Sequence, residues 1–163
     1  EHPITFTAGI RANPNEILDS KIKVINTNRG GKITLHNPGQ KIVYFVLDLN
    51  KRKKDIRKLI SLIEKSIIEF LKVCNIKGIR DKKNIGIWVK KRKIAAIGLR
   101  ISKWIAFHGC SINIDNDLSQ YLKIRPCGLN NKKITSIKKE KGKLIKNIEN
   151  KLISIFLNNI NKI

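Results

Sequence analysis

The chain has 163 residues, a formal net charge of +23 and a hydrophobic content of 41%. Its length suits one domain, its apolar content excludes wholesale disorder, and it has no run of about 20 apolar residues that would cross a bilayer. The charge favours an acidic partner, and nucleic acid is the first candidate. Because the lysines are spread along the whole chain, an acidic protein would satisfy the same electrostatics.

The first half of the chain predicts two strands and a helix. Residues 1–28 mix short apolar stretches with prolines and predict a strand followed by a loop. The β-branched and aromatic segment 41–49 predicts a strand that is apolar on both faces, which suits a central position in a sheet. Apolar residues at helical spacing predict a helix over 55–74, with Asp55 at its start.

The second half predicts further strands and a terminal helix. In chain order these are strands over 85–89 and 93–101 joined by a basic turn, a strand over 104–114, a short helix or loop over 116–124, and an amphipathic helix from Glu140 onward. Helices and strands that alternate with hairpin-like joins indicate one α+β domain, residues 1–163, with a mixed or antiparallel sheet.

The three cysteines, Cys74, Cys110 and Cys127, are odd in number and far apart, and no CxxC pair exists. This pattern argues against a disulfide framework and against a zinc ribbon, and it favours a reducing compartment. The opening EHPITFTAGI lacks the basic and apolar regions of a signal peptide.

The segment RGGKITLHNPGQ, residues 29–40, is the most turn-rich part of the chain. Gly30 and Gly31 free two backbone N–H groups to face a ligand, and Arg29 is suited to bind a carboxylate or a phosphate. His36 precedes another turn. Because glycine and proline commonly mark turns, a hairpin loop with a solvated arginine and a capping histidine explains the same residues.

The segment KIAAIG, residues 93–98, combines a lysine with small apolar residues. In a regular strand, alternation places Lys93, Ala95 and Ile97 on one face, where burial would lower the pKa of the ammonium group. Gly98 inside a strand indicates close approach by a ligand or another backbone. One more surface lysine is the alternative, since lysines are mostly exposed.

Two more segments, FHGCSIN and IRPCGL, hold groups that are able to carry chemistry. In the first, His108 interrupts an apolar strand, and a buried, hydrogen-bonded histidine beside an inert Cys110 is the plainer explanation. In the second, Cys127 stands between a proline and a glycine, which suit a bend that presents a thiol. A small buried hydrophobic residue is the alternative there.

In this order, RGGKITLHNPGQ, KIAAIG, HG and PCG resemble the lipoyl(octanoyl) transferase family. The family pattern is an RGG–T–H–PGQ loop followed by K-[IV]-A-[AS]-I-G, HG and PCG. The opening EHPITFTAG resembles the family's N-terminal strand, so the resemblance runs from residue 1 to about residue 136. Each motif is weak alone, but four in register are specific.

The sequence departs from the family pattern at a few positions. Asn37 stands where the family usually has glycine, Lys41 where it has a hydrophobic residue, and GCSIN replaces GLALN. The family also usually has an element upstream of EHP, so the resemblance implies a domain that lacks an N-terminal element.

The resemblance implies the fold of the biotin and lipoate protein ligases, an α/β sandwich of two sheets with flanking helices. It implies transfer of an octanoyl group from acyl carrier protein to a lipoyl-domain lysine, with Cys127 as the acyl-thioester nucleophile, Lys93 as its acid/base partner, and no metal, nucleotide or other cofactor. The implied substrate-binding residues are Arg29, Gly30, Gly31, Lys32, Ile33, Thr34, Leu35, His36, Ala96, Ile97, Gly98, His108, Gly109, Cys110 and Ser111.

The implied partners are octanoyl-acyl carrier protein as donor, and the lipoyl domains of 2-oxoacid dehydrogenase complexes and the glycine cleavage H protein as acceptors. The resemblance implies that neither nucleic acid nor a membrane takes part. We expect a monomer in the bacterial cytoplasm or an organellar matrix.

Three other functions fit parts of the sequence. An ATP-dependent lipoate–protein ligase shares the fold but needs no cysteine. A basic nucleic-acid-binding module fits the charge, but aromatic residues make up only 6% of the chain and do not interleave with the basic runs. A zinc site made by His36, His108 and Cys127 lacks a ligand spacing signature.

Overall fold

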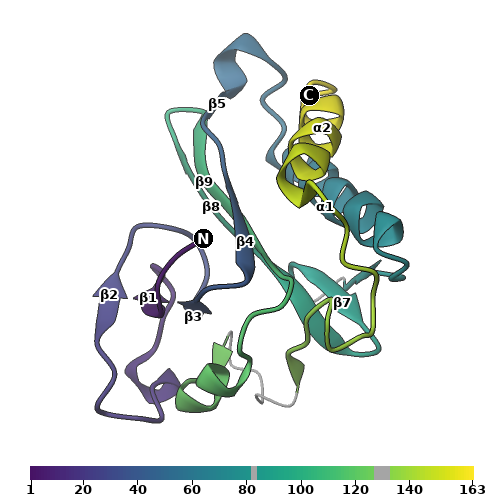
Figure 1. Ribbon diagram of the computed structural model, residues 1–163. Coiled ribbons are helices and arrows are strands. Elements are labelled where there is room, and N and C mark those ends of the chain that lie inside the picture. The colour runs from purple at the N-terminus through teal and green to yellow at the C-terminus, as the bar shows by residue number, and fades with distance from the viewer. Residues whose placement is uncertain (82–83, 127–132) are drawn as a thin grey trace.

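The computed structural model describes residues 1–81, 84–126 and 133–163 and has an α+β fold with two sheets and two helices. The helices lie together on one face of the larger sheet, and the smaller sheet lies on the side away from them (Figure 1). The larger sheet therefore has one face packed on helices and another face turned toward the smaller sheet.

The larger sheet is antiparallel, and its strands follow the order β4-β9-β8-β7-β6, with β5 also paired to β9. Lys90 and Lys91 form the turn between β7 and β8 with positive φ, and Lys103 and Trp104 do the same between β8 and β9. Such left-handed pairs match the twist of two-residue hairpins. The strand bounds are Gln40–Tyr44 (β4), Leu47–Asp48 (β5), Ile79–Arg80 (β6), Ile87–Val89 (β7), Arg92–Ser102 (β8) and Ile105–Asn113 (β9).

Two helices cover the larger sheet. Helix α1, Ile56–Val73, begins where the Asp55 side chain accepts a hydrogen bond from the Lys58 N–H. The buried apolar residues of its inner face are Leu59, Ile63, Ile67, Phe70 and Leu71. Helix α2, Ile148–Ile160, packs against α1. The main hydrophobic core lies between these helices and strands β7, β8 and β9.

The smaller sheet has β1 (Thr5–Ala8) in its centre, parallel to β2 (Val24–Asn26) and antiparallel to β3 (Ile33–His36). A second core forms beneath it. Its buried members are Phe6, Ile33 and Leu35 from the sheet, Tyr121 and Ile124 from and beside the 3₁₀ helix η3 (Ser119–Lys123), and Ile134. Short 3₁₀ turns also occur at η1 (Pro14–Glu16) and η2 (Leu49–Lys51).

The predicted helix over 55–74, the hairpin strands in the second half and the short helix near 116–124 are confirmed. Two expectations are wrong. Residues 41–49 form an edge strand and a short second strand rather than a central strand, and their outward apolar side chains line a cavity instead of a core. The terminal helix starts at Ile148, not near Glu140, because Lys141 and Asn147 have positive φ, which a right-handed helix does not allow.

Candidate active site

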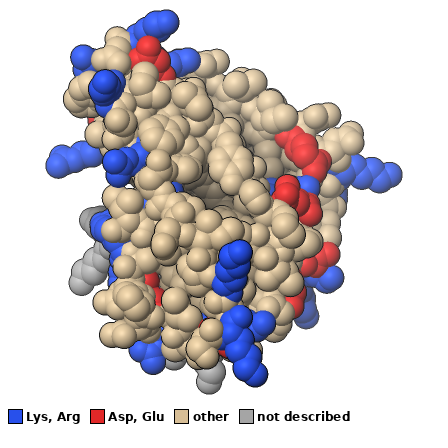
Figure 2. Space-filling model, turned by 90° about the vertical axis from the view of Figure 1, so that its left-hand side faces the viewer, with Lys and Arg blue, Asp and Glu red and all other residues tan. Residues whose placement is uncertain are grey.

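A cavity of about 690 Å³ lies between the two sheets. Strands β1 and β3 contribute one wall, and strands β4, β8 and β9 contribute the other. Figure 2 shows that this side of the molecule is hollowed and that the hollow is bordered mainly by uncharged residues, with basic side chains further out. The volume is typical of a site for a small molecule or for one arm of a larger substrate.

The β3 wall follows strict strand alternation. Thr34 and His36 face the cavity, whereas Ile33 and Leu35 point into the second core with exposed fractions of 1% and 0%. Lys32, just before the strand, also lines the cavity. Of the predicted binding residues in this segment, Ile33 and Leu35 therefore support the wall from behind and do not line it.

The β8 wall is irregular. Ile87 of β7 pairs with Ala95, but the next residue, Trp88, pairs with Lys93, so Ile94 is an extra residue in β8. This β-bulge turns both Ile94 and Ala95 toward the main core and leaves Ala96 on the cavity side with Lys93. The expectation that Lys93, Ala95 and Ile97 share one face is therefore wrong for Ala95, because it assumed a regular strand; Lys93 and Ile97 both line the cavity.

Strand β9 supplies His108, Gly109, Cys110 and Ser111 to the cavity. A Cβ on Gly109 would collide with the Val43 carbonyl, so only glycine allows β4 to pair this closely here. Burial raises the pKa of the Cys110 thiol to about 12, which keeps that thiol un-ionised at neutral pH and unsuited to act as a nucleophile.

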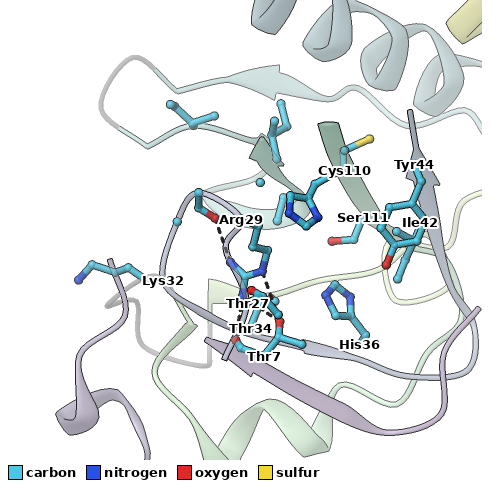
Figure 3. Close-up of a pocket in the computed structure, with 18 of the residues that line it drawn as sticks. Thr7, Thr27, Arg29, Lys32, Thr34, His36, Ile42, Tyr44, Cys110 and Ser111 are labelled. Atoms are coloured by element: carbon cyan, nitrogen blue, oxygen red, sulfur yellow. Dashed lines mark hydrogen bonds between the residues drawn. The ribbon is translucent and has the colours of Figure 1, made fainter. Parts of the chain in front are cut away.

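Arg29 lies across the seam between the sheets. Its guanidinium donates hydrogen bonds to the carbonyl and hydroxyl oxygens of Thr7 and to the Gly30 carbonyl, at 2.8 to 3.3 Å (Figure 3). Gly98 lies opposite, where an added Cβ would approach the Arg29 Cδ atom to 3.3 Å. The glycines of both motifs thus let the arginine stem and the Gly30 backbone pack directly on β8, where the Gly30 N–H donates to the Leu99 carbonyl at 3.0 Å.

Lys93 is buried, with an exposed fraction of 7%, and its ammonium lies 5.4 Å from the centre of the Trp88 ring. Gly86, at φ +128°, makes room for it, since a Cβ there would lie 2.5 Å from the Lys93 Cε atom. The Lys93 carbonyl accepts a hydrogen bond from the Thr135 N–H at 2.9 Å. Pro126 and Ile134 line a second small cavity with Lys93, so both described ends that flank residues 127–132 lie beside this lysine. Cys127 itself lies outside the described residues.

Burial lowers the pKa of His36, and the positive charges of Arg29 and His2 add to this, while a hydrogen bond to Gln40 opposes it. The His36 Nδ1 atom lies 2.8 Å from Gln40 Oε1. The pKa of His108 is also lowered, first by burial and then by Arg29, and its Nε2 atom lies 2.6 Å from Asn28 Oδ1. Both rings are therefore neutral at pH 7.

Several residues of the cavity were missed by sequence reasoning. The cavity also includes His2, Thr5, Thr7, Arg11, Ile25, Thr27, Ile42, Tyr44, Asn84 and Ile85. The sequence signal for Ile42 and Tyr44 is the second apolar face of segment 41–49, which fits a cavity wall on an edge strand as well as a central strand. Gly86, which makes room for the Lys93 side chain, belongs to none of the sequence motifs.

Among the described residues, no group of three or more histidine, cysteine or acidic side chains is placed to hold a metal ion. No helix in the described parts of the chain is both long and apolar enough to span a bilayer.

The chain belongs to the family of lipoyl protein ligase A/B catalytic domains, whose sequence profile matches residues 1–155. Among curated proteins it is similar to the octanoyltransferase of Bartonella bacilliformis, with 47% identity over 151 residues, 84% of this chain and 63% of that protein. The octanoyltransferase of Brucella melitensis is 43% identical over 151 residues, 84% of this chain and 57% of its own. The chain thus spans about three fifths of the length of these relatives.

Solved structures support the fold. A putative lipoate protein ligase from T. acidophilum with bound lipoic acid has a TM-score of 0.79 at 13% identity, over 98% of this chain and 70% of that one. Biotin protein ligase from Aquifex aeolicus in complex with biotin and ATP has a TM-score of 0.61 at 14% identity, over 96% of this chain and 70% of that one. The expected fold of the biotin and lipoate protein ligases is confirmed.

Proposed function

We propose that this chain is the catalytic domain of an octanoyltransferase of lipoate biosynthesis. It moves an octanoyl group from octanoyl-acyl carrier protein to a lysine of a lipoyl domain, through a thioester on Cys127. Its membership of the family and its similarity to octanoyltransferases support this proposal.

The observation that carries the proposal is the placement of Lys93. Its ammonium is buried at the cavity, and the flanks of the segment that contains Cys127, Pro126 and Ile134, lie against it. A thiol reaching this place would have a cation beside it, which favours the thiolate that attacks an acyl group. A free thiol has a pKa near 8.5, and each unit by which a neighbour lowers it corresponds to about 1.4 kcal/mol.

These two groups carry both half-reactions, and one proton per turnover is released to solvent. The Cys127 thiolate attacks the acyl carbonyl, its new C–S bond forms as the pantetheine C–S bond breaks, and Lys93 gives a proton to the departing thiolate. The neutral Lys93 then takes a proton from the incoming lysine ammonium, whose amine attacks the thioester. The C–N bond forms, the thiolate of Cys127 leaves, and the former amine nitrogen releases its second proton to solvent. Both groups of the enzyme then return to their first state.

The cavity suits an acyl chain. Ile25, Ile42, Ile85 and Ile97 give it apolar walls, and the glycines let the backbone of both sheets approach the substrate closely. The implied binding residues other than Ile33 and Leu35 line it. Acyl carrier proteins and lipoyl domains tend to be acidic, so a net charge of +23 would speed encounter with both at low salt.

The test is transfer of octanoyl from its carrier protein to a lipoyl domain without ATP. We expect transfer by the wild type and none by Cys127→Ser. The control Cys74→Ala should transfer fully, because Cys74 lies in the main core and does not line the cavity. Unchanged transfer by Cys127→Ser would refute the assignment of the nucleophile. Turnover of free octanoate that depends on ATP would instead identify a ligase.

A further inference from the structure

A network of buried amide side chains is connected through Gln40 to His36 in the wall of the cavity. The Asn113 Nδ2 atom donates to the Thr135 carbonyl at 3.0 Å, and its Oδ1 accepts from Gln40 Nε2 at 2.8 Å and from Asn116 Nδ2 at 3.3 Å. Asn116 also donates to Asn37 Oδ1 at 2.9 Å. Gln40 and Asn113 are buried, with exposed fractions of 0% and 6%.

The orientation of the Asn113 and Gln40 amides in this network is fixed by backbone carbonyls, which only accept. The Thr135 carbonyl requires the nitrogen of Asn113 on its side, which turns the Asn113 oxygen toward Gln40. The Leu35 carbonyl, 3.3 Å from Gln40 Nε2, separately requires the nitrogen of Gln40 there. Two independent acceptors thus orient the Gln40 amide, so its assignment does not depend on a choice between oxygen and nitrogen.

This orientation leaves the Gln40 oxygen to face His36. Because Oε1 can only accept, the Nδ1 atom of His36 must carry a proton and donate it. A neutral imidazole has only one N–H, so Nε2 keeps its lone pair. Figure 3 shows the ring standing in the cavity, with Ser111, Ile42 and Tyr44 near it on one side.

We infer that Gln40 fixes His36 as the Nδ1–H tautomer and that His36 Nε2 accepts an N–H of the amine that receives the acyl group. The second half of this inference rests on the proposed function. His36 lies two residues along β3 from Thr34, and Thr34 lines both cavities with Lys93. The acceptor ammonium has three N–H groups, of which Lys93 takes one proton, so a second N–H is available to hold the nitrogen in place.

This role separates the two half-reactions. The acyl donor presents a thioester carbonyl, which needs hydrogen-bond donors and gains nothing from the lone pair of Nε2. The accepting amine needs an acceptor. Loss of Nε2 should therefore slow transfer to the lipoyl domain much more than it slows acyl loading of the enzyme, because the lone pair of Nε2 acts only in the second step.

The tautomer is tested without any substrate. Long-range proton–nitrogen NMR of the labelled protein reports which ring nitrogen of His36 carries the proton, and we expect Nδ1. In Gln40→Leu no acceptor faces Nδ1, so we expect part of the ring population to carry its proton on Nε2 instead. The control Gln120→Leu makes the same change beside Asp117, away from the ring, and should leave the spectrum of His36 unaltered. A wild-type ring protonated at Nε2 would overturn the inference.

The amine contact is tested by measuring the two half-reactions separately. Because His36 also lines the acyl cavity, both steps are measured in the same variant, and we expect His36→Leu to slow transfer to the lipoyl domain at least tenfold more than it slows octanoyl loading. His36→Gln, whose amide oxygen can take the place of Nε2, should recover much of the transfer rate. Equal slowing of both steps, or unchanged transfer by His36→Leu, would overturn the contact. Failure of the wild type to load at all would instead refute the proposed function.

Discussion

The two walls of the cavity differ in the regularity of the strands that form them. The β3 wall is a regular strand, in which every second residue faces the cavity and the others fill a core. The β8 wall contains a bulge at Ile94, and the groups that face the cavity are displaced by one position beyond it. The comparison shows that a regular strand lines the cavity with alternate residues, whereas a β-bulge changes which residues of a strand face the cavity next to Lys93.

The largest expected effect is on the β8 wall. Replacing Lys93 by methionine keeps most of its apolar contacts but removes the ammonium, and we expect acyl transfer to fall by about 10²- to 10⁴-fold, as loss of a general acid–base typically causes. Steady-state transfer rates measure it. Lys91→Met, an exposed change in the adjoining turn, is the matched control. A loss of less than tenfold in Lys93→Met would contradict the assigned role.

The alternation of the β3 wall predicts opposite effects for neighbouring residues. Leu35 is fully buried, so Leu35→Ala should lower the free energy of unfolding by about 2 to 5 kcal/mol. Thr34→Ala, on the cavity face, should change it by less than about 0.5 kcal/mol, as substitutions away from packed features usually do. Urea denaturation compares the two, and similar losses would show that the strand does not alternate as described.

The bulged wall also depends on the room left for Lys93. Gly86→Ala adds a Cβ at φ +128°, where backbone strain costs about 1 to 3 kcal/mol, and that Cβ would meet Lys93 Cε. We expect a smaller loss of stability when Gly86→Ala is made in a Lys93→Ala background, because the side-chain collision is then absent. A double-mutant cycle measures the difference, and additive effects would mean that the two residues do not compete for space.

The smallest expected effect is the pH dependence of stability, to which one histidine from each wall contributes. The folded pKa values of His36 and His108 are lowered, so the unfolded chain binds more protons near their ordinary value of 6.5. The free energy of unfolding should therefore be highest above pH 7 and fall toward pH 5, by at most about 1.4 kcal/mol per pH unit for each proton. Double replacement of His36 and His108 by glutamine should flatten this slope; an unchanged slope would assign it to other groups.

Sequence reasoning predicted well where periodicity decides the structure. The stripe of helix α1 and the hairpins of β7, β8 and β9 follow directly from local patterns. The motifs also predicted most of the cavity, because RGGKITLHNPGQ and KIAAIG meet across the seam at Gly30 and Leu99.

The rest depends on contacts between distant segments. The bulge at Ile94 arises from pairing with β7, and no residue in β8 alone marks it. The apolar outward face of β4 looks the same in sequence whether it meets a core or a cavity, and only the position of the smaller sheet decides between them. The orientation of the Gln40 amide is likewise set by carbonyls from other segments of the chain. The Leu35 carbonyl acts directly, and the Thr135 carbonyl acts by orienting Asn113.

The central claim is that the acyl group rests on the thiol of Cys127 beside Lys93. Mass spectrometry of the protein after brief exposure to octanoyl-acyl carrier protein, followed by peptide mapping, tests it most directly. We predict a single octanoyl group on the peptide that contains Cys127, formed quickly by the wild type and far more slowly by Lys93→Met. An octanoyl group on another residue, or loading at the same rate without the Lys93 ammonium, would contradict the account.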